Sequence, residues 1–207
     1  MSDYRIFNLG AFKFQCGTVM PDTKLAYKTY GKLNSDGSNA VLLGVPVVGT
    51  HETANEIHLH GPNRAINIKR HFVIAPNMFG NGLSSSPSNA EEQFKGPEFP
   101  LVTIYDNVIA QHMLVTKELG ISKLKLVAGF SMGGQQAYHW AAMFPKMVEA
   151  VAPICTSARC SPHNWLFIEG LIAALTADPK FNYGRYDSNP KVGMRALSIV
   201  WSGWMFS

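Results

Sequence analysis

Paired cysteines are missing from the sequence. The chain has three cysteines, Cys16, Cys155 and Cys160, and they form no C-x-x-C motif. A disulfide framework uses an even set of cysteines, and a cysteine-based zinc site uses closely spaced pairs. We therefore expect neither a disulfide framework nor a zinc site.

Long apolar runs and basic clusters are also missing. No apolar stretch approaches the roughly 18 residues of a membrane-spanning helix, and the N-terminus lacks the basic and apolar regions of a signal peptide. The formal net charge is +4, but lysine and arginine are spread along the chain, whereas nucleic-acid binding needs them on one face. We expect a cytoplasmic protein that binds neither membranes nor nucleic acids.

Four continuous apolar runs are present in a chain that is 46% hydrophobic and 15% charged. Such runs are typical of strands buried on both faces of a sheet. They are residues 40–45, 71–76, 124–129 and 148–154. Helical spacing of apolar residues appears between the runs, over residues 104–119, and again over 135–144. Strands that alternate with helices predict a mostly parallel sheet with flanking helices.

The two ends of the chain differ from this middle part. Residues 4–30 predict three short strands, at 4–9, 12–16 and 24–30. After Cys155 the pattern becomes helical, over residues 163–177 and 193–204, with no further buried strand. We expect a sheet-containing core over residues 1–156 and a helical part over 157–207. Residues 79–100, rich in Gly, Asn, Ser and Pro, predict a long loop, and loops of that length are usually functional.

The motif G-x-S-x-G occupies residues 129–133, between a predicted strand and a predicted helix. In this context it indicates a nucleophile elbow, a sharp turn that presents a serine at the carboxyl end of the sheet. Ser131 is the candidate nucleophile. The backbone N–H of Met132, at the start of the helix, is a candidate oxyanion donor.

A base for Ser131 is harder to find. In the elbow architecture an acid and then a histidine follow the serine along the chain, and here the later histidines are His139 and His163. His139 is eight positions further along the same helix, so its Cα lies roughly 12 Å from that of Ser131. His163 begins the helical part. No further strand is predicted after the helical part, so neither these histidines nor the acids after Ser131 lie beyond such a strand. These acids are Glu149, Glu169, Asp178 and Asp187.

Histidines and acids also gather in the stretch HETANEIHLH, which contains His51, Glu52, Glu56, His58 and His60. The spacing differs from the zinc-binding H-E-x-x-H pattern, and no cysteine lies nearby. The stretch favours a polar surface loop over a metal site.

Several longer stretches carry a resemblance that covers essentially the whole chain. They are KLAYKTYGKLN (24–34), GPNRAIN (61–67), PNMFGNGLSSSPSN (76–89), VTIYDNVIAQHMLVTKELGI (102–121), GFSMGGQQAYHWAAMFP (129–145) and DPKFNYGRY (178–186). Together they resemble the homoserine O-acetyltransferase family of α/β-hydrolase-fold proteins. The resemblance implies an α/β-hydrolase fold with a partial helical lid over residues 157–207. It also implies that Ser131 forms the acyl-enzyme and that Val47, with Val48 next, supplies the second oxyanion N–H.

Two departures from the family pattern bear on activity. Family members run well past 300 residues, and their triad Asp and His follow strands that come after the lid. This chain ends inside the lid, so we expect those residues and the last strands to be absent. In the family a lid-helix sequence G-L-x-x-A-R ends in the arginine that binds the homoserine carboxylate. Here Ser198 takes that place and Arg195 lies three residues earlier, so we do not expect homoserine as the substrate.

The resemblance predicts acyl transfer through Ser131, either as an ester hydrolase or as an O-acyltransferase. The partner would be a small-molecule ester or acyl donor, with acyl-CoA a candidate substrate and no cofactor. The alternative is an inactive pseudoenzyme or an interaction module that lacks the triad Asp and His. The sequence leaves open whether the chain forms a homodimer.

Overall fold

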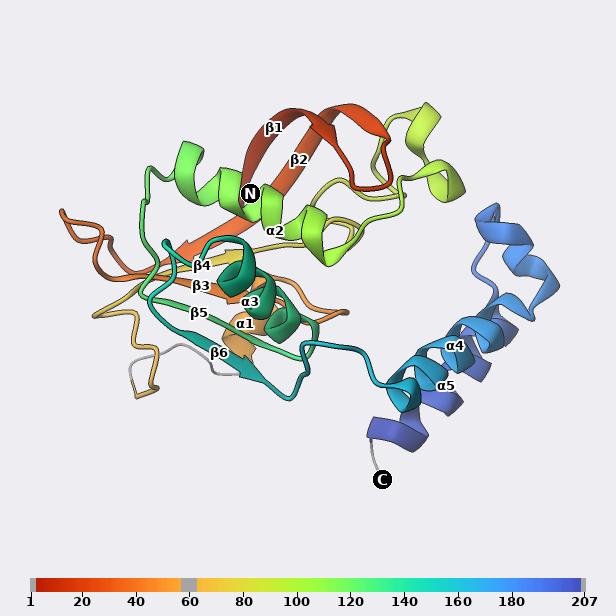
Figure 1. The fold of residues 1–207 in the computed structure, drawn as a ribbon. Coiled ribbons are helices and arrows are strands. Elements are labelled where there is room, and N and C mark those ends of the chain that lie inside the picture. The colour runs from red at the N-terminus through yellow and green to blue at the C-terminus, as the bar shows by residue number, and fades with distance from the viewer. Residues whose placement is uncertain (1–2, 57–62, 206–207) are drawn as a thin grey trace. The chain divides into compact units, whose positions relative to one another are not determined.

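The computed structural model describes residues 3–56 and 63–205 (Figure 1). The chain divides into two compact units. The first consists of residues 1–95 and 99–158, and the second of residues 96–98 and 159–207.

The first unit is built on a six-stranded sheet with the order β1-β2-β4-β3-β5-β6. The strands are β1 (Arg5–Lys13), β2 (Val19–Tyr30), β3 (Ala40–Gly44), β4 (Phe72–Pro76), β5 (Leu126–Phe130) and β6 (Val151–Ile154). β1, β2 and β4 pair antiparallel, whereas β4, β3, β5 and β6 are parallel. Every residue of β3 is buried, as expected for a strand covered on both faces. The predicted mostly parallel sheet is confirmed.

The N-terminal strands differ from the prediction. Two long strands replace the three short ones, because β1 continues through a register shift at Gly10, where φ is 68°. The predicted strand at residues 12–16 is therefore wrong. Its first two residues end β1, and the rest form a turn in which the N–H of Gly17 donates to the carbonyl of Phe14 at 2.9 Å.

Different helices cover the two faces of the sheet (Figure 1). On one face lie α2 (Ile104–Met113), which continues as a π-helical turn at Leu114–Glu118, and α3 (Met132–Met143). They contribute Val108, Leu114 and Trp140 to the larger apolar cluster. On the other face, Ala54 of α1 (His51–Glu56) belongs to a smaller cluster of buried strand residues.

Helix α1 corrects the expectation of a polar surface loop at HETANEIHLH. Residues 51–56 form the helix, and His51 is only 2% exposed. His58 and His60 lie outside the described residues.

The long loop before α2 is ordered by its own polar side chains. Ser84, Ser85 and Ser86 are buried. The Oγ of Ser84 accepts from the N–H of Ala26 (3.0 Å), and the Oγ of Ser85 accepts from the N–H of Lys24 (2.9 Å). The loop thereby satisfies backbone donors of β2. Two short 3-10 turns, Glu92–Phe94 and Gly96–Glu98, follow it.

The second unit consists of α4 (Pro162–Thr176), a 3-10 segment at Pro179–Gly184, and α5 (Lys191–Met205). Buried Asp178 joins them, because its carboxylate accepts from the N–H groups of Lys180 (3.0 Å), Val192 (3.1 Å) and Gly193 (3.0 Å). These backbone hydrogen bonds, that of Gly193 first, lower the pKa of Asp178.

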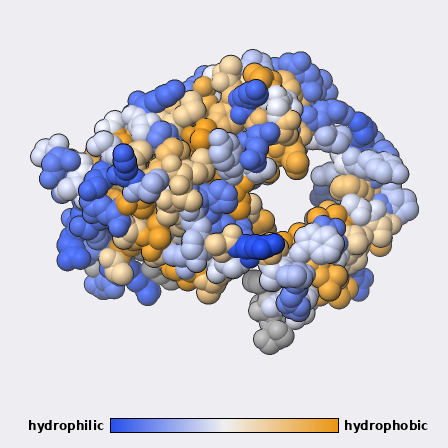
Figure 2. Space-filling model, in the orientation of Figure 1, coloured by the Kyte–Doolittle hydropathy of each residue, from blue (hydrophilic) through white to orange (hydrophobic). Residues whose placement is uncertain are grey.

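Apolar side chains are exposed on both long helices of this unit, where apolar surface is visible (Figure 2). They include Trp165, Leu166, Ile172 and Ile199. None of the helices that the structure describes combines the length and apolarity needed to cross a membrane.

Candidate active site

Ser131 lies between the end of β5 and the start of α3. Its backbone has φ 54° and ψ −122°, a conformation that for a residue other than glycine costs on the order of 1–3 kcal/mol. Its N–H donates to the carbonyl of Ile154 (2.9 Å), and its carbonyl accepts from the N–H of Gly134 (2.9 Å). The sheet and the helix thus hold the strained turn. Its side chain is partly exposed and has no hydrogen-bond partner among the described residues.

Three glycines make this turn possible, because backbone segments meet there without room for side chains. Gly44 of β3 and Gly129 of β5 are neighbours in the sheet register. A Cβ on Gly133 would lie 2.2 Å from the Gly44 carbonyl oxygen, and a Cβ on Gly129 would lie 2.3 Å from the Gly133 carbonyl carbon. Both glycines of the motif are therefore required by packing. The same contact places the end of β3 against the first turn of α3.

The two N–H groups predicted to bind an oxyanion are close to this contact in the sequence, since Met132 precedes Gly133 and Val47 comes three residues after Gly44. Met132 begins α3, where the first N–H groups of a helix have no intrahelical acceptor. Val47 lies in a turn after β3, closed by the Gly49 N–H donating to the Pro46 carbonyl at 2.8 Å. Within the described part of the chain, neither the Met132 N–H nor the Val47 N–H has an acceptor. Both donors are thus free to bind a ligand oxygen.

Within the first unit, none of the described histidines forms a hydrogen bond with Ser131. His139 Nδ1 is 3.1 Å from the Gln135 carbonyl within α3, and the His163 ring packs on Trp204 with centroids 4.5 Å apart. The other described histidines also have neighbours elsewhere, and they are His51, His71 and His112. Burial lowers the pKa of His71 and His112. The described part of the first unit therefore shows no histidine base in hydrogen-bond contact with Ser131.

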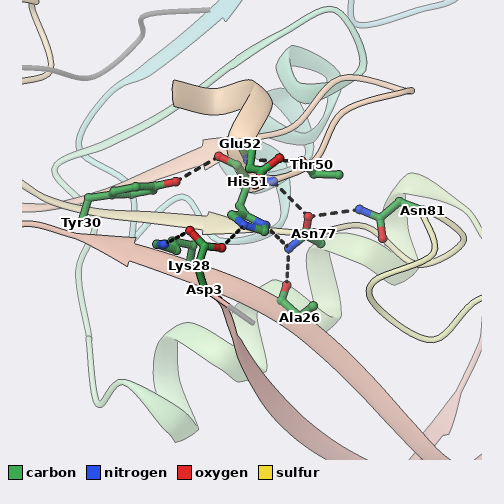
Figure 3. Close-up of polar contacts among 9 residues, drawn as sticks. All are labelled: Asp3, Ala26, Lys28, Tyr30, Thr50, His51, Glu52, Asn77 and Asn81. Atoms are coloured by element: carbon green, nitrogen blue, oxygen red, sulfur yellow. Dashed lines mark hydrogen bonds and ion pairs between the residues drawn. The ribbon is translucent and has the colours of Figure 1, made fainter. Parts of the chain in front are cut away.

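A group of possible metal ligands lies at α1, away from the motif in sequence. Atoms of Asp3, His51 and Glu52 fall within 4.8 Å of one another. Both ring nitrogens of His51 already have neighbours, Asn77 Nδ2 at 3.1 Å and Asp3 Oδ1 at 3.1 Å, and Lys28 forms an ion pair with Asp3 (Figure 3). The lysine charge opposes a cation here, so hydrogen bonding accounts for the group without a metal.

Sequence reasoning missed two buried amides that contact the backbone of Val45, Met132 and His51. Asn77 follows β4 directly and Gln136 lies in α3, and both are 0% exposed. A polar residue at the carboxyl end of a buried strand was the available signal for Asn77. Gln136 could have been noticed because it lies four residues after Met132, on the face that the helix buries.

Comparison with known proteins adds the family. The family described as alpha/beta hydrolase fold matches residues 60–195. The chain belongs to this family. The predicted α/β-hydrolase fold is thereby confirmed.

Individual α/β hydrolases match nearly the whole chain. An ethyl acetate hydrolase of Pseudomonas veronii is 41% identical over 205 residues, covering 97% of this chain and 58% of its own. The crystal structure of an acetylester hydrolase from Corynebacterium glutamicum superposes with a TM-score of 0.94 at 40% identity, covering 99% of this chain and 59% of that one.

The resemblance to homoserine O-acetyltransferases is also confirmed. The enzyme of Mesorhizobium japonicum is 38% identical over 203 residues, covering 91% of this chain and 52% of its own. The chain therefore spans about 52–59% of the length of these relatives. All three are named as enzymes of ester hydrolysis or acyl transfer.

Proposed function

We propose that Ser131 is the nucleophile of an acyl-transfer enzyme whose main reaction is the hydrolysis of short-chain carboxylic esters. The Ser131 Oγ attacks the ester carbonyl, and the N–H groups of Met132 and Val47 stabilise the oxyanion that forms. The alcohol leaves, and water then hydrolyses the acyl-enzyme on Ser131. The proposal requires a general base for Ser131, since a serine hydroxyl is a weak nucleophile without one.

The observation that carries the proposal is the backbone of Ser131. A serine with φ 54° and ψ −122°, next to glycines whose Cβ atoms would overlap neighbouring backbone, is a costly arrangement. Packing gains nothing from it, because the side chain is partly exposed and lacks a described partner. Presentation of a reactive hydroxyl explains the strain.

The preference for ester hydrolysis over transfer to homoserine rests on the second unit. Ser198, at the position where the family resemblance expects arginine, donates its hydroxyl to the Met194 carbonyl of its own helix at 2.8 Å. A neutral hydroxyl so engaged cannot replace a guanidinium as a carboxylate ligand. The relatives named as ester hydrolases are also the more similar, at 40–41% identity against 38%.

The test compares hydrolysis with transfer in the full protein that carries this chain. Ethyl acetate and p-nitrophenyl acetate are offered as esters, and acetyl-CoA with homoserine as the transfer pair. We expect ester hydrolysis that Ser131→Ala abolishes and that the exposed Ser35→Ala leaves unchanged. Efficient transfer to homoserine would overturn the substrate preference, and full activity of Ser131→Ala would overturn the nucleophile.

A second candidate is a catalytically inactive protein that binds a partner. The observation in its favour is that no described histidine of the first unit forms a hydrogen bond with Ser131. It predicts no turnover of any of these substrates by the folded wild-type protein.

A further inference from the structure

The segment of residues 45–51 carries the Val47 donor, and we call it the oxyanion segment. Apolar packing holds it weakly at its centre, since Val47 is 52% exposed and Val48 is 76% exposed. One turn hydrogen bond, from the Gly49 N–H to the Pro46 carbonyl, fixes the local shape. An oxyanion donor must be placed to within a few tenths of an ångström, so the position of this turn has to be set from outside it.

Gln136 fixes the first end of the oxyanion segment. Its Nε2 donates to the Val45 carbonyl at 3.0 Å and lies 3.3 Å from the Met132 carbonyl in its own helix. One amide of α3 therefore contacts both the residue that begins the oxyanion segment and the residue that supplies the other oxyanion N–H.

The orientation of the Gln136 amide follows from Trp140. An indole N–H can only donate, so the Gln111 atom that it meets at 2.9 Å must be the oxygen. The Nε2 of Gln111 then donates to Gln136 Oε1 at 2.6 Å, which leaves the Nε2 of Gln136 to donate to Val45. All three side chains are 0% exposed, so this chain of hydrogen bonds has no competing water.

Asn77 fixes the other end of the oxyanion segment (Figure 3). Its Oδ1 accepts from the His51 N–H (3.0 Å) and from Asn81 Nδ2 (3.2 Å). Its Nδ2 donates to the Ala26 carbonyl (3.2 Å) and to His51 Nδ1 (3.1 Å). A backbone N–H can only donate and a carbonyl can only accept, so this orientation is also determined. The His51 ring, held through Nδ1, carries its proton on Nε2 and donates to Asp3.

We propose that Gln136 and Asn77 are positioning residues of the oxyanion hole, which hold the oxyanion segment at its two ends and set Val47 relative to Met132. This inference rests on the proposed function of Ser131. Neither amide touches the reacting atoms, and each acts through the backbone that it binds. Their loss should affect the transition state, where the oxyanion exists, far more than substrate binding.

The test compares Gln136→Met with Gln135→Met in the full protein. Methionine has about the volume of glutamine but donates no hydrogen bond. Gln135 is the neighbouring, partly exposed residue of the same helix. For Gln136→Met we expect kcat for p-nitrophenyl acetate to fall on the order of 10- to 100-fold with KM changed less than about 3-fold. The rate constant for phosphonylation by a fluorophosphonate should fall in parallel. Gln135→Met should match the wild type.

The possible outcomes separate the two proposals. If the wild type shows no reaction that depends on Ser131, the proposed function fails. If the wild type reacts and Gln136→Met keeps the wild-type kcat, with or without a change in KM, the positioning role is refuted. The assignment of Ser131 as the nucleophile then still stands. If circular dichroism shows that Gln136→Met is unfolded, Asn77→Ser tests the positioning role at the other end of the oxyanion segment. The criterion is the same: kcat should fall while KM changes little. Failure of both variants to fold would show that the amides are structural only, and would refute the inference.

Discussion

Gly133→Ala should destabilise the protein although alanine favours helices. The new methyl carbon would lie 2.2 Å from the Gly44 carbonyl oxygen and 2.7 Å from its carbonyl carbon. An ordinary contact between carbon and oxygen needs about 3.3 Å or more, so β3 and α3 must separate by about 1 Å. Both sides of the contact consist of backbone atoms, which cannot move aside as easily as a flexible side chain. Overpacking of this kind costs about 3 kcal/mol, against about 1 kcal/mol gained in helix propensity.

The expected net effect is a loss of about 2 kcal/mol in the free energy of unfolding. Urea unfolding followed by circular dichroism measures it. Gly170→Ala in α4 is the matched control, since its methyl carbon meets nothing within 4 Å, and it should gain about 0.5–1 kcal/mol. If Gly133→Ala were as stable as the wild type, the close contact between β3 and α3 would not constrain the fold, and the packing explanation of the motif would be wrong.

Two further substitutions test the strain at Ser131 and the role of Asp178. Ser131→Gly should be more stable than Ser131→Ala by about 1 kcal/mol in urea unfolding, because glycine accepts φ 54° without strain; equal stability would argue against strain. Asp178→Asn should be less stable than the wild type near pH 7. Because the folded-state pKa of Asp178 lies below 3.8, the contribution of the carboxylate is present above that pH and is lost as the pH falls through the lower folded value. The difference in thermal midpoint between the two proteins should therefore shrink below about pH 4, and a constant difference would contradict this account.

The sheet and the long helices could be predicted because the apolar pattern within each segment indicates which of its residues are buried. The apolar runs before Asn77 and before Ser131 became β4 and β5, and the helix after Ser131 became α3. Helix α1 could not be predicted in this way. Its residues have no apolar periodicity, and His51 is buried through hydrogen bonds to Asn77, 26 residues away in the chain.

The candidate site also has one part that the sequence predicts and another part that depends on non-local contacts. Ser131 and its glycines form a local motif, so sequence alone pointed to the turn. The contact of Gly44 with Gly133 depends on which strands become neighbours in the sheet, and no local pattern reports that. The orientation of Gln136 depends on Gln111 and Trp140, two residues on different helices. Such non-local pairs appear only once the fold is known.

The most direct test of the central claim is the site of covalent labelling by a fluorophosphonate in the full protein that carries this chain. The tryptic peptide of residues 126–146 contains Ser131 as its one serine, so mass spectrometry assigns the label without ambiguity. We predict that this peptide gains one phosphonyl group, that the label is lost in Ser131→Ala, and that it persists in Ser35→Ala. A folded wild-type protein that remains unlabelled, or that is labelled equally in Ser131→Ala, would contradict the assignment of Ser131 as the nucleophile.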